Sequence, residues 1–213
     1  MSSSRGNIII LGGGGHAKVL IELIRLRKEF TIAGILDPGL KQGSEISAIP
    51  VIGDDDMLPD LLRNRDIRYA CIAVGSVRDT VRRRALYEKV RAMGFSVPLL
   101  IHPSAIVSES AEVSQGAQLM AHTVIQAGST IGENTIVNTG AIIEHDCRIG
   151  SHIHICPAVV ISGGCRIEEG SFIGAGATVI HQVHVGSNVT VAAGAVVIRD
   201  IANGATVRGV PAR

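Results

Sequence analysis

The chain has 213 residues, which is enough for one large domain or two modest ones. Its formal net charge of +1 gives no reason to expect a nucleic-acid surface. No run approaches the roughly 20 apolar residues of a membrane span, and no signal peptide opens the chain, so we expect a cytoplasmic protein. Hydrophobic residues make up 46% of the chain but aromatic residues only 2%, which predicts a core of aliphatic side chains in regular layers.

The first 100 residues alternate between strand and helix patterns. Strands are expected at 7–11, 32–36, 69–74 and 97–100, after a loose leader over residues 1–6. Helices are expected at 17–28, 54–63 and 77–93, the last of them with Ser76 as its N-cap. This alternation predicts a small N-terminal α/β domain, Rossmann-like with βαβ units and a parallel sheet, over residues 1–100.

A glycine-rich loop follows the first strand of this domain. Gly12, Gly13, Gly14, Gly15, His16 and Ala17 fit a loose GxGxxA dinucleotide fingerprint, and Asp37 lies twenty residues after Ala17. Taken alone, the pattern suggests NAD, but the domain is about half the size of a full dinucleotide fold. A nucleotide-sugar site fits better, with the glycines close to the diphosphate and Asp37 on the base or ribose. In that interpretation Gly75 and Ser76 line the pocket and His16 lies by the phosphates or the sugar. A purely structural tight turn is the alternative.

The second half of the chain repeats with a period of six residues. Sixteen consecutive positions at this spacing are aliphatic: Val107, Val113, Leu119, Ile125, Ile131, Val137, Ile143, Ile149, Ile155, Ile161, Ile167, Ile173, Val179, Val185, Val191 and Val197. The residue two positions earlier is usually small. Neither a helix nor an ordinary strand meander has this period, whereas hexapeptide β-solenoids do. We therefore expect a solenoid over residues 101–213, whose pattern breaks after Val197 and restarts briefly at Val207.

Four cysteines occur without any CxxC spacing, so a zinc site is not expected. Cys147 and Cys165 both occupy the small inward position, eighteen residues apart. If one coil contains three hexads, they stack on adjacent coils about 5 Å apart as buried, reduced thiols.

The hexads with the closing segment RGVPAR resemble the left-handed β-helix acyltransferases. The segments IIILGGGGHAKV, ILDP and IAVG resemble one branch of them, the PglD/NeuD-like sugar acetyltransferases. This resemblance covers essentially the whole chain. It implies a left-handed parallel β-helix, a homotrimer, acetyl-CoA in the groove between adjacent β-helices and a nucleotide in the N-terminal domain.

Acetyl transfer to an amine needs a base to take the amine proton and donors to hold the thioester oxygen. The sequence places His145 between Glu144 and Asp146. The family motif is a histidine followed by an acidic residue, with an asparagine seven residues upstream, which Asn138, His145 and Asp146 match. The resemblance therefore implies that His145 is the general base and that Asp146 orients its imidazole. Members like PglD have Glu where this chain has the shorter Asp146. A surface histidine flanked by solvated acids is the alternative.

Six other histidines of the expected solenoid compete for this role. His181 lies thirty-six residues after His145 and is expected in the same column two coils away, about 10 Å off and too far for a dyad. By resemblance, His154 helps to bind cofactor or substrate. The remaining solenoid histidines are expected at the surface, and no spacing among them indicates a metal: His102, His122, His152 and His184.

For acetyl-CoA, the candidates are backbone amides of small residues late in the repeat, where the pantetheine arm can approach closely: Gly163, Gly164, Ala175, Gly176, Ala193 and Gly194. Arg208 and Arg213 are candidates for the CoA phosphates.

The sequence thus predicts an acetyl-CoA-dependent N-acetyltransferase acting on a UDP- or GDP-linked 4-amino-4,6-dideoxy sugar for surface glycan assembly. A sialic acid O-acetyltransferase is the second possibility, because the same histidine can activate a hydroxyl. A non-catalytic trimeric scaffold is the third.

Overall fold

The computed structural model describes residues 6–64, 67–76 and 80–213, and the leader expected over residues 1–6 falls mostly outside these ranges. The chain divides into two compact units. The first comprises the described residues up to Gly75 together with Arg82–Pro98, and the second comprises Ser76–Val81 with Leu99–Arg213. Each unit is built on its own hydrophobic core.

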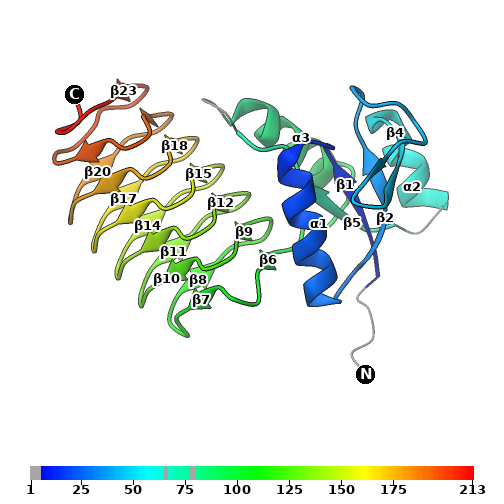
Figure 1. Cartoon of the computed structure of the whole chain (residues 1–213), viewed down its shortest axis with the longest axis horizontal. Helices are drawn as coiled ribbons and strands as arrows, with labels where there is room; N and C mark the ends of the chain where they lie inside the picture. Colours follow the sequence, from blue (N-terminus) through cyan, green and yellow to red (C-terminus); the bar gives the residue numbers. More distant parts are fainter. Residues whose placement is uncertain (1–5, 65–66, 77–79) are drawn as a thin grey trace. The chain divides into compact units, whose positions relative to one another are not determined.

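The first unit contains a five-stranded sheet with the order β3-β4-β2-β1-β5 (Figure 1). Its parallel part consists of the expected strands β1 (Asn7–Leu11), β2 (Thr31–Leu36) and β5 (Tyr69–Ile72), which pair with β1 at the centre. The sheet also contains a hairpin that was not predicted, in which β3 (Glu45–Ile46) is antiparallel to β4 (Ile49–Gly53). The sheet is therefore mixed rather than purely parallel.

Three α-helices accompany this sheet, and two predicted boundaries in this unit are wrong. Helix α1 (Gly15–Arg27) confirms the first expected helix, and η1 (Asp55–Met57) runs into α2 (Leu58–Asn64) where the second was expected. Helix α3 (Val81–Ala92) begins at Val81, so Ser76 is not its N-cap, and residues 77–79 lie outside the described ranges. Val97 also lies outside any strand, which corrects the strand expected at 97–100.

The core of this unit lies between the sheet and its helices and consists mostly of aliphatic side chains, as the composition predicted. The apolar face of α3 packs on the sheet through Tyr87 and Val90, against Ile9 and Ile72. Strand β1 is continuously buried from Ile8 to Leu11, as is typical of a central parallel strand.

The second unit is a stack of two-residue strands in three parallel sheets (Figure 1). One sheet, called sheet D, consists of β7 (Ile106–Val107), β10 (Val124–Ile125), β13 (Ile142–Ile143), β16 (Val160–Ile161), β19 (Thr178–Val179) and β22 (Val196–Val197). Sheet E consists of β8 (Glu112–Val113), β11 (Thr130–Ile131), β14 (Arg148–Ile149), β17 (Arg166–Ile167) and β20 (His184–Val185). Sheet C consists of β6 (Leu100–Ile101), β9 (Gln118–Leu119), β12 (Ile136–Val137), β15 (His154–Ile155), β18 (Phe172–Ile173), β21 (Thr190–Val191) and β23 (Thr206–Val207).

Each strand pairs with the strand eighteen residues away, for example Ile143 with Ile161, which confirms three hexads per coil. The aliphatic residue of each hexad points inward, and those from Leu119 to Val197 are buried. Near the C-terminus the spacing shortens, because Thr190 pairs with Thr206 and Val185 bridges Ile201. This two-residue deletion is the break in the period after Val197.

Within the ranges that the structure describes, no helix is long and apolar enough to cross a membrane.

Candidate active site

His145 lies at a corner of the solenoid, in the turn over residues 144–147 that joins β13 to β14. Its Nδ1 atom is 2.8 Å from Oδ2 of Asp146, and both side chains are exposed. Because the carboxylate only accepts, this bond places the proton on Nδ1 and leaves the Nε2 lone pair available to take a proton. Asp146 has a φ of 59°, a left-handed conformation that Asp tolerates better than most residues. The corner thus breaks strand alternation and brings the two side chains together.

Two glycines clear space around this pair. A Cβ at Gly163, in the next coil, would lie 2.6 Å from Nε2 of His145. A Cβ at Gly128, in the preceding coil, would lie 2.7 Å from Oδ1 of Asp146. The reactive nitrogen of the imidazole therefore lies against the backbone of Gly163, which is one of the predicted acetyl-CoA residues. Its neighbour Gly164 donates its N–H to the carbonyl of His145 at 2.9 Å.

The hydrogen bond to Asp146 raises the pKa of His145, and the charges of Asp146 and Glu144 raise it further, against a small opposing effect of desolvation. A raised pKa makes Nε2 a stronger base. The predicted contact between His145 and Asp146 is therefore present, in the geometry that a general base and its orienting carboxylate require.

His181 occupies the same column two coils further on, with Gly163 and Gly164 between them. The backbone shows this directly, since Gly164 N–H donates to His145 O and Gln182 N–H donates to Gly163 O. The column predicted from the thirty-six-residue spacing is confirmed. Inside the same column Cys147 and Cys165 are buried and free, as predicted.

A second polar group lies at the other end of β13. His154 is buried and donates from Nδ1 to the carbonyl of Ser76 at 3.1 Å, while its Nε2 lies 3.3 Å from Nδ2 of Asn138. The ring of Phe172 meets the imidazole edge-on, with 5.5 Å between the ring centroids. The structure thus joins Asn138, Ser76 and His154, but at a different corner from His145. Within one chain, the predicted site is split over two corners that flank sheet D.

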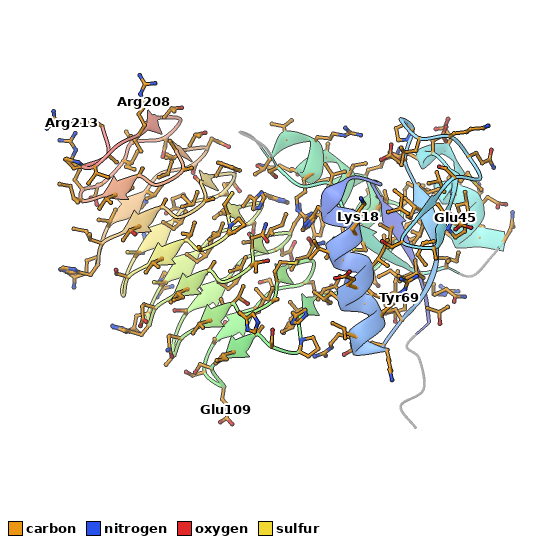
Figure 2. All side chains as sticks on the ribbon, in the orientation of Figure 1. Lys18, Glu45, Tyr69, Glu109, Arg208 and Arg213 are labelled. Carbon is orange, nitrogen blue, oxygen red and sulfur yellow. The ribbon has the colours of Figure 1, made fainter. Side chains whose placement is uncertain are left out.

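The predicted cofactor residues divide in the same way. Gly163 and Gly164 lie in the column of His145, whereas the other four lie in the column of Asn138: Ala175, Gly176, Ala193 and Gly194. These four are exposed, and a Cβ at Gly176 or Gly194 would meet nothing within 4 Å. Figure 2 shows the side chains of Arg208 and Arg213 extending outward at the C-terminal end of the stack, where the two backbones pair at 3.0 and 3.1 Å.

One histidine prediction is wrong. His152 is buried rather than at the surface, and its Nδ1 lies 2.9 Å from Nδ2 of Asn134, the equivalent corner residue one coil earlier. His102 is half-buried and contacts Ser104 at 2.8 Å, whereas His122 and His184 are exposed. Among the described residues, no three His, Cys, Asp or Glu side chains come together in a way that could hold a metal ion.

In the first unit, the glycine-rich loop lies at the carboxyl edge of the sheet, as predicted. Gly12 has a φ of 99°, and a Cβ there would lie 2.8 Å from Val74, so the turn itself requires glycine. At Gly14 and Gly15 a Cβ would meet nothing within 4 Å, and no side chain caps the N-terminus of α1. These two glycines leave the amide end of the helix open, which suits a phosphate.

Asp37 and Gly75 lie beside this loop. The two carboxylate oxygens of Asp37 accept the N–H groups of Gly13 at 2.7 Å and Gly39 at 2.8 Å. Asp37 therefore holds the loop in its conformation. The sequence analysis expected a contact to the base or ribose and did not predict this role. A Cβ at Gly75 would lie 3.7 Å from Cβ of His16, so these two predicted residues are neighbours.

A cavity of about 200 Å³ opens at the same edge of the sheet. Its walls are mostly apolar, and its charged lining residues are Asp55, Arg82 and Lys89, with Lys89 3.3 Å from Asp55. Sequence reasoning missed all three. Arg82 and Lys89 lie seven residues apart on α3, a spacing that places both on one helix face and so could have identified them.

The sequence analysis also did not identify Arg83. It is buried and donates from Nη1 to the carbonyls of Ile72 at 2.7 Å and Val74 at 3.1 Å. Burial lowers the pKa of Arg83 to about 10 and raises that of the neighbouring Cys71 to about 12. Arg83 thereby fixes the segment that leads from β5 to Gly75.

Comparison with known proteins relates both halves of the chain to one group of enzymes. The PglD N-terminal domain family matches residues 7–90, and the bacterial transferase hexapeptide family (six repeats) matches residues 164–199. UDP-N-acetylbacillosamine N-acetyltransferase of Bacillus subtilis is 39% identical over 121 residues, which are 54% of this chain and 51% of that enzyme. The match thus spans about half the length of this curated relative.

Two solved structures match over nearly their whole length. A histidine variant of perosamine N-acetyltransferase from Caulobacter crescentus, in complex with CoA and GDP-perosamine, is 40% identical, with a TM-score of 0.91 over 100% of this chain and 98% of the other. The acetyltransferase domain of PglB from Neisseria gonorrhoeae, in complex with acetyl coenzyme A, is 41% identical, with a TM-score of 0.90 over 99% of each chain.

Proposed function

Because the chain belongs to the PglD-like family of left-handed β-helix acetyltransferases, we propose that it acetylates the 4-amino group of a nucleotide-linked 4-amino-4,6-dideoxy sugar. The acetyl donor is acetyl-CoA, and the product serves surface glycan biosynthesis. The observation that carries the proposal is the hydrogen-bonded pair of His145 and Asp146, whose free Nε2 atom faces the backbone of Gly163.

In the proposed reaction, the sugar amine attacks the thioester carbonyl carbon and Nε2 of His145 takes the amine proton. Asp146 holds the imidazole in the required tautomer and stabilises the imidazolium that forms. A C–N bond forms, the C–S bond breaks, and the proton passes to the CoA thiolate. The backbone N–H of Gly163, beside the imidazole of His145, is the proposed donor to the carbonyl oxygen as charge develops there.

The nucleotide is proposed to bind in the first unit. The open amide end of α1 at Gly14 and Gly15 suits the diphosphate, and His16 and Gly75 lie beside it. The apolar cavity that contains Arg82 and Lys89 suits the base. Family relatives use both nucleotides, since one is named for a UDP-linked sugar and another was solved with GDP-perosamine.

Assembly as a homotrimer, with a mass of about three times 22.3 kDa, is proposed from the faces of the solenoid. The outward positions of sheet D are almost all aliphatic: Ile106, Val124, Ile142, Val160 and Val196. Ile106 is 65% exposed, and the other four are partly exposed. Sheet E instead presents charged and polar residues outward: Glu112, Thr130, Arg148, Arg166 and His184.

Burial of sheet D against further copies would remove this apolar strip from water. The corner of His145 and the corner of Asn138 and His154 flank sheet D. Packing on this sheet would bring the first corner of one copy to the second corner of the next, with acetyl-CoA between them. The proposal of a site shared between copies is supported by the separation of the site residues in one chain, where His145 and Asn138 lie at different corners. We place the reaction in the cytoplasm, where the four free cysteines stay reduced.

The function is tested by incubation with acetyl-CoA and a panel of UDP- and GDP-linked amino sugars, with free thiol as the readout. Thiol release with a 4-amino sugar is expected, and its dependence on nucleotide identifies the base. Release only with sialic acid would instead establish the O-acetyltransferase, which the same histidine permits. No release with any acceptor would contradict the proposal.

A further inference from the structure

Three buried hydroxyl groups of the solenoid share one arrangement. Ser129, Thr135 and Ser171 are each fully buried, at 0% exposure. Each donates to the carbonyl of the residue fifteen positions ahead and accepts the N–H of the residue eighteen positions ahead. Each hydroxyl therefore ties together the two ends of one corner in the following coil.

Ser129 holds the corner that carries the catalytic pair. Its Oγ atom is 2.6 Å from the carbonyl oxygen of Glu144 and 3.0 Å from the amide nitrogen of Cys147. His145 and Asp146 are the two residues between these attachment points. Their side chains are exposed, so core packing does not fix them, and the geometry of their backbone corner sets the 2.8 Å contact between them.

The line of bonds continues towards Gly163. The Sγ atom of Cys147 donates to the carbonyl of Ser162 at 3.2 Å, and Ser162 directly precedes the glycine that faces His145. Interaction with the neighbouring Cys165, together with burial, raises the pKa of Cys147, which keeps it a thiol and therefore a donor. The corner of His145 and that of Gly163 are thus both tied from inside the solenoid.

We propose that Ser129 is a positioning residue for acetyl transfer, which fixes the corner of His145 so that the imidazole keeps its bond to Asp146 and its place against Gly163. The inference rests on the proposed function. Loss of the hydroxyl removes the partner of the part-buried Glu144 carbonyl and of the buried Cys147 N–H, and the corner then relaxes. A displacement of about 1 Å at a catalytic group is enough to lower a rate severely.

The chain provides a matched control for this experiment. Ser171 donates to Gly186 at 2.9 Å and accepts from Val189 at 3.0 Å, with the same spacing in the sequence, but its corner carries none of the proposed site residues. Ser129→Ala and Ser171→Ala therefore remove chemically equivalent bonds. A purely structural role predicts the same result for both.

We expect Ser129→Ala to lower kcat about tenfold. Both KM values should stay within about twofold of wild type, because substrate binding does not depend on this corner. Ser171→Ala should lower the melting temperature to a similar extent and leave kcat unchanged. Ser129→Thr, which keeps the hydroxyl, should restore kcat. If Ser129→Ala is insoluble, Ser129→Cys decides, because Cys147 and Cys165 show that a thiol fits and can donate at the equivalent position of the next two coils. A thiol accepts the N–H of Cys147 only weakly, so kcat should fall below that of wild type, and an unchanged kcat would overturn the proposal.

A second measurement does not depend on turnover. The imidazole signals of the full chain can be titrated by NMR, and the signal of His145 identified by its absence in His145→Ala. Ser129→Ala should lower the pKa of His145, because the bond to Asp146 weakens, whereas Ser171→Ala should leave it unchanged. Equal titration in all three proteins would overturn the proposal. Absence of acetyl transfer in wild type would overturn the proposed function alone, since this titration would still report on Ser129.

Discussion

His145 and His181 stand in one column of the solenoid, two coils apart, at equivalent positions of equivalent corners. His145 is followed by Asp146 and bonds to it at 2.8 Å, whereas His181 is followed by Gln182, which carries no charge. His145 also has Gly163 beneath its ring, where a Cβ would lie 2.6 Å from Nε2. The repeat therefore places both histidines at equivalent corners. His145 is followed by a carboxylate and has a glycine next to its Nε2 atom, whereas His181 is followed by an uncharged amide.

This comparison separates what the fold provides from what the site provides. Both corners expose the side chain at their second position, because that is how the coil turns there. A general base additionally requires a fixed tautomer and an unobstructed nitrogen, and these come from single residues in the same and the next coil.

The largest effect is expected from removal of the base. His145→Ala should lower kcat by about 10²–10⁴-fold and change both KM values little, because binding relies on other residues. Steady-state kinetics with acetyl-CoA and the preferred amino sugar measures both quantities. A kcat near that of wild type would remove His145 from the mechanism.

The next largest effect concerns the cleared space. Gly163→Ala fits the local backbone, but its Cβ would displace the imidazole, which should lower kcat by about a hundredfold at most. The melting temperature should hardly change, since the displaced ring is exposed. An unchanged kcat would show that the ring can move without consequence.

Asp146→Asn should have a smaller effect, a loss of about tenfold in kcat, on the order of the loss of one hydrogen bond. The bond to Asp146 raises the pKa of His145, so its loss lowers that pKa. A base must be neutral to act, and the acidic limb of the pH–rate profile should therefore move to lower pH. A limb that stays in place or moves upward would contradict the assignment of Asp146.

The smallest effect is expected at the equivalent histidine. His181→Ala should stay within a few-fold of wild type in kcat, because no carboxylate follows it in the sequence. Collapse of activity in this variant would place the catalytic centre in a different coil.

The sequence was most informative where one pattern repeats. The period of six predicted the coils, their inward residues and the shared column of His145 and His181, because each coil repeats the same steric requirement. It failed at His152, which is buried with its Nδ1 atom 2.9 Å from Nδ2 of Asn134. That partner lies a full coil away, so no local signal reports it.

The first unit was harder to predict for a different reason. The hairpin of β3 and β4 consists of short, weakly patterned strands, and the start of α3 at Val81 is marked by no capping residue that the sequence analysis recognised. The burial of Arg83 could not be predicted either. Its partners are backbone carbonyls at and just after the end of β5, and a sequence pattern does not show such contacts.

The most direct test of the account is the pH dependence of the single-turnover rate, with both substrates saturating, in wild type and in His145→Ala. If Nε2 of His145 takes the amine proton, the wild-type rate should rise with pH through an inflection above the ordinary pKa of histidine, because the hydrogen bond to Asp146 raises the pKa. The residual rate of His145→Ala should lack this inflection. An inflection that persists at the same pH in His145→Ala would contradict the account.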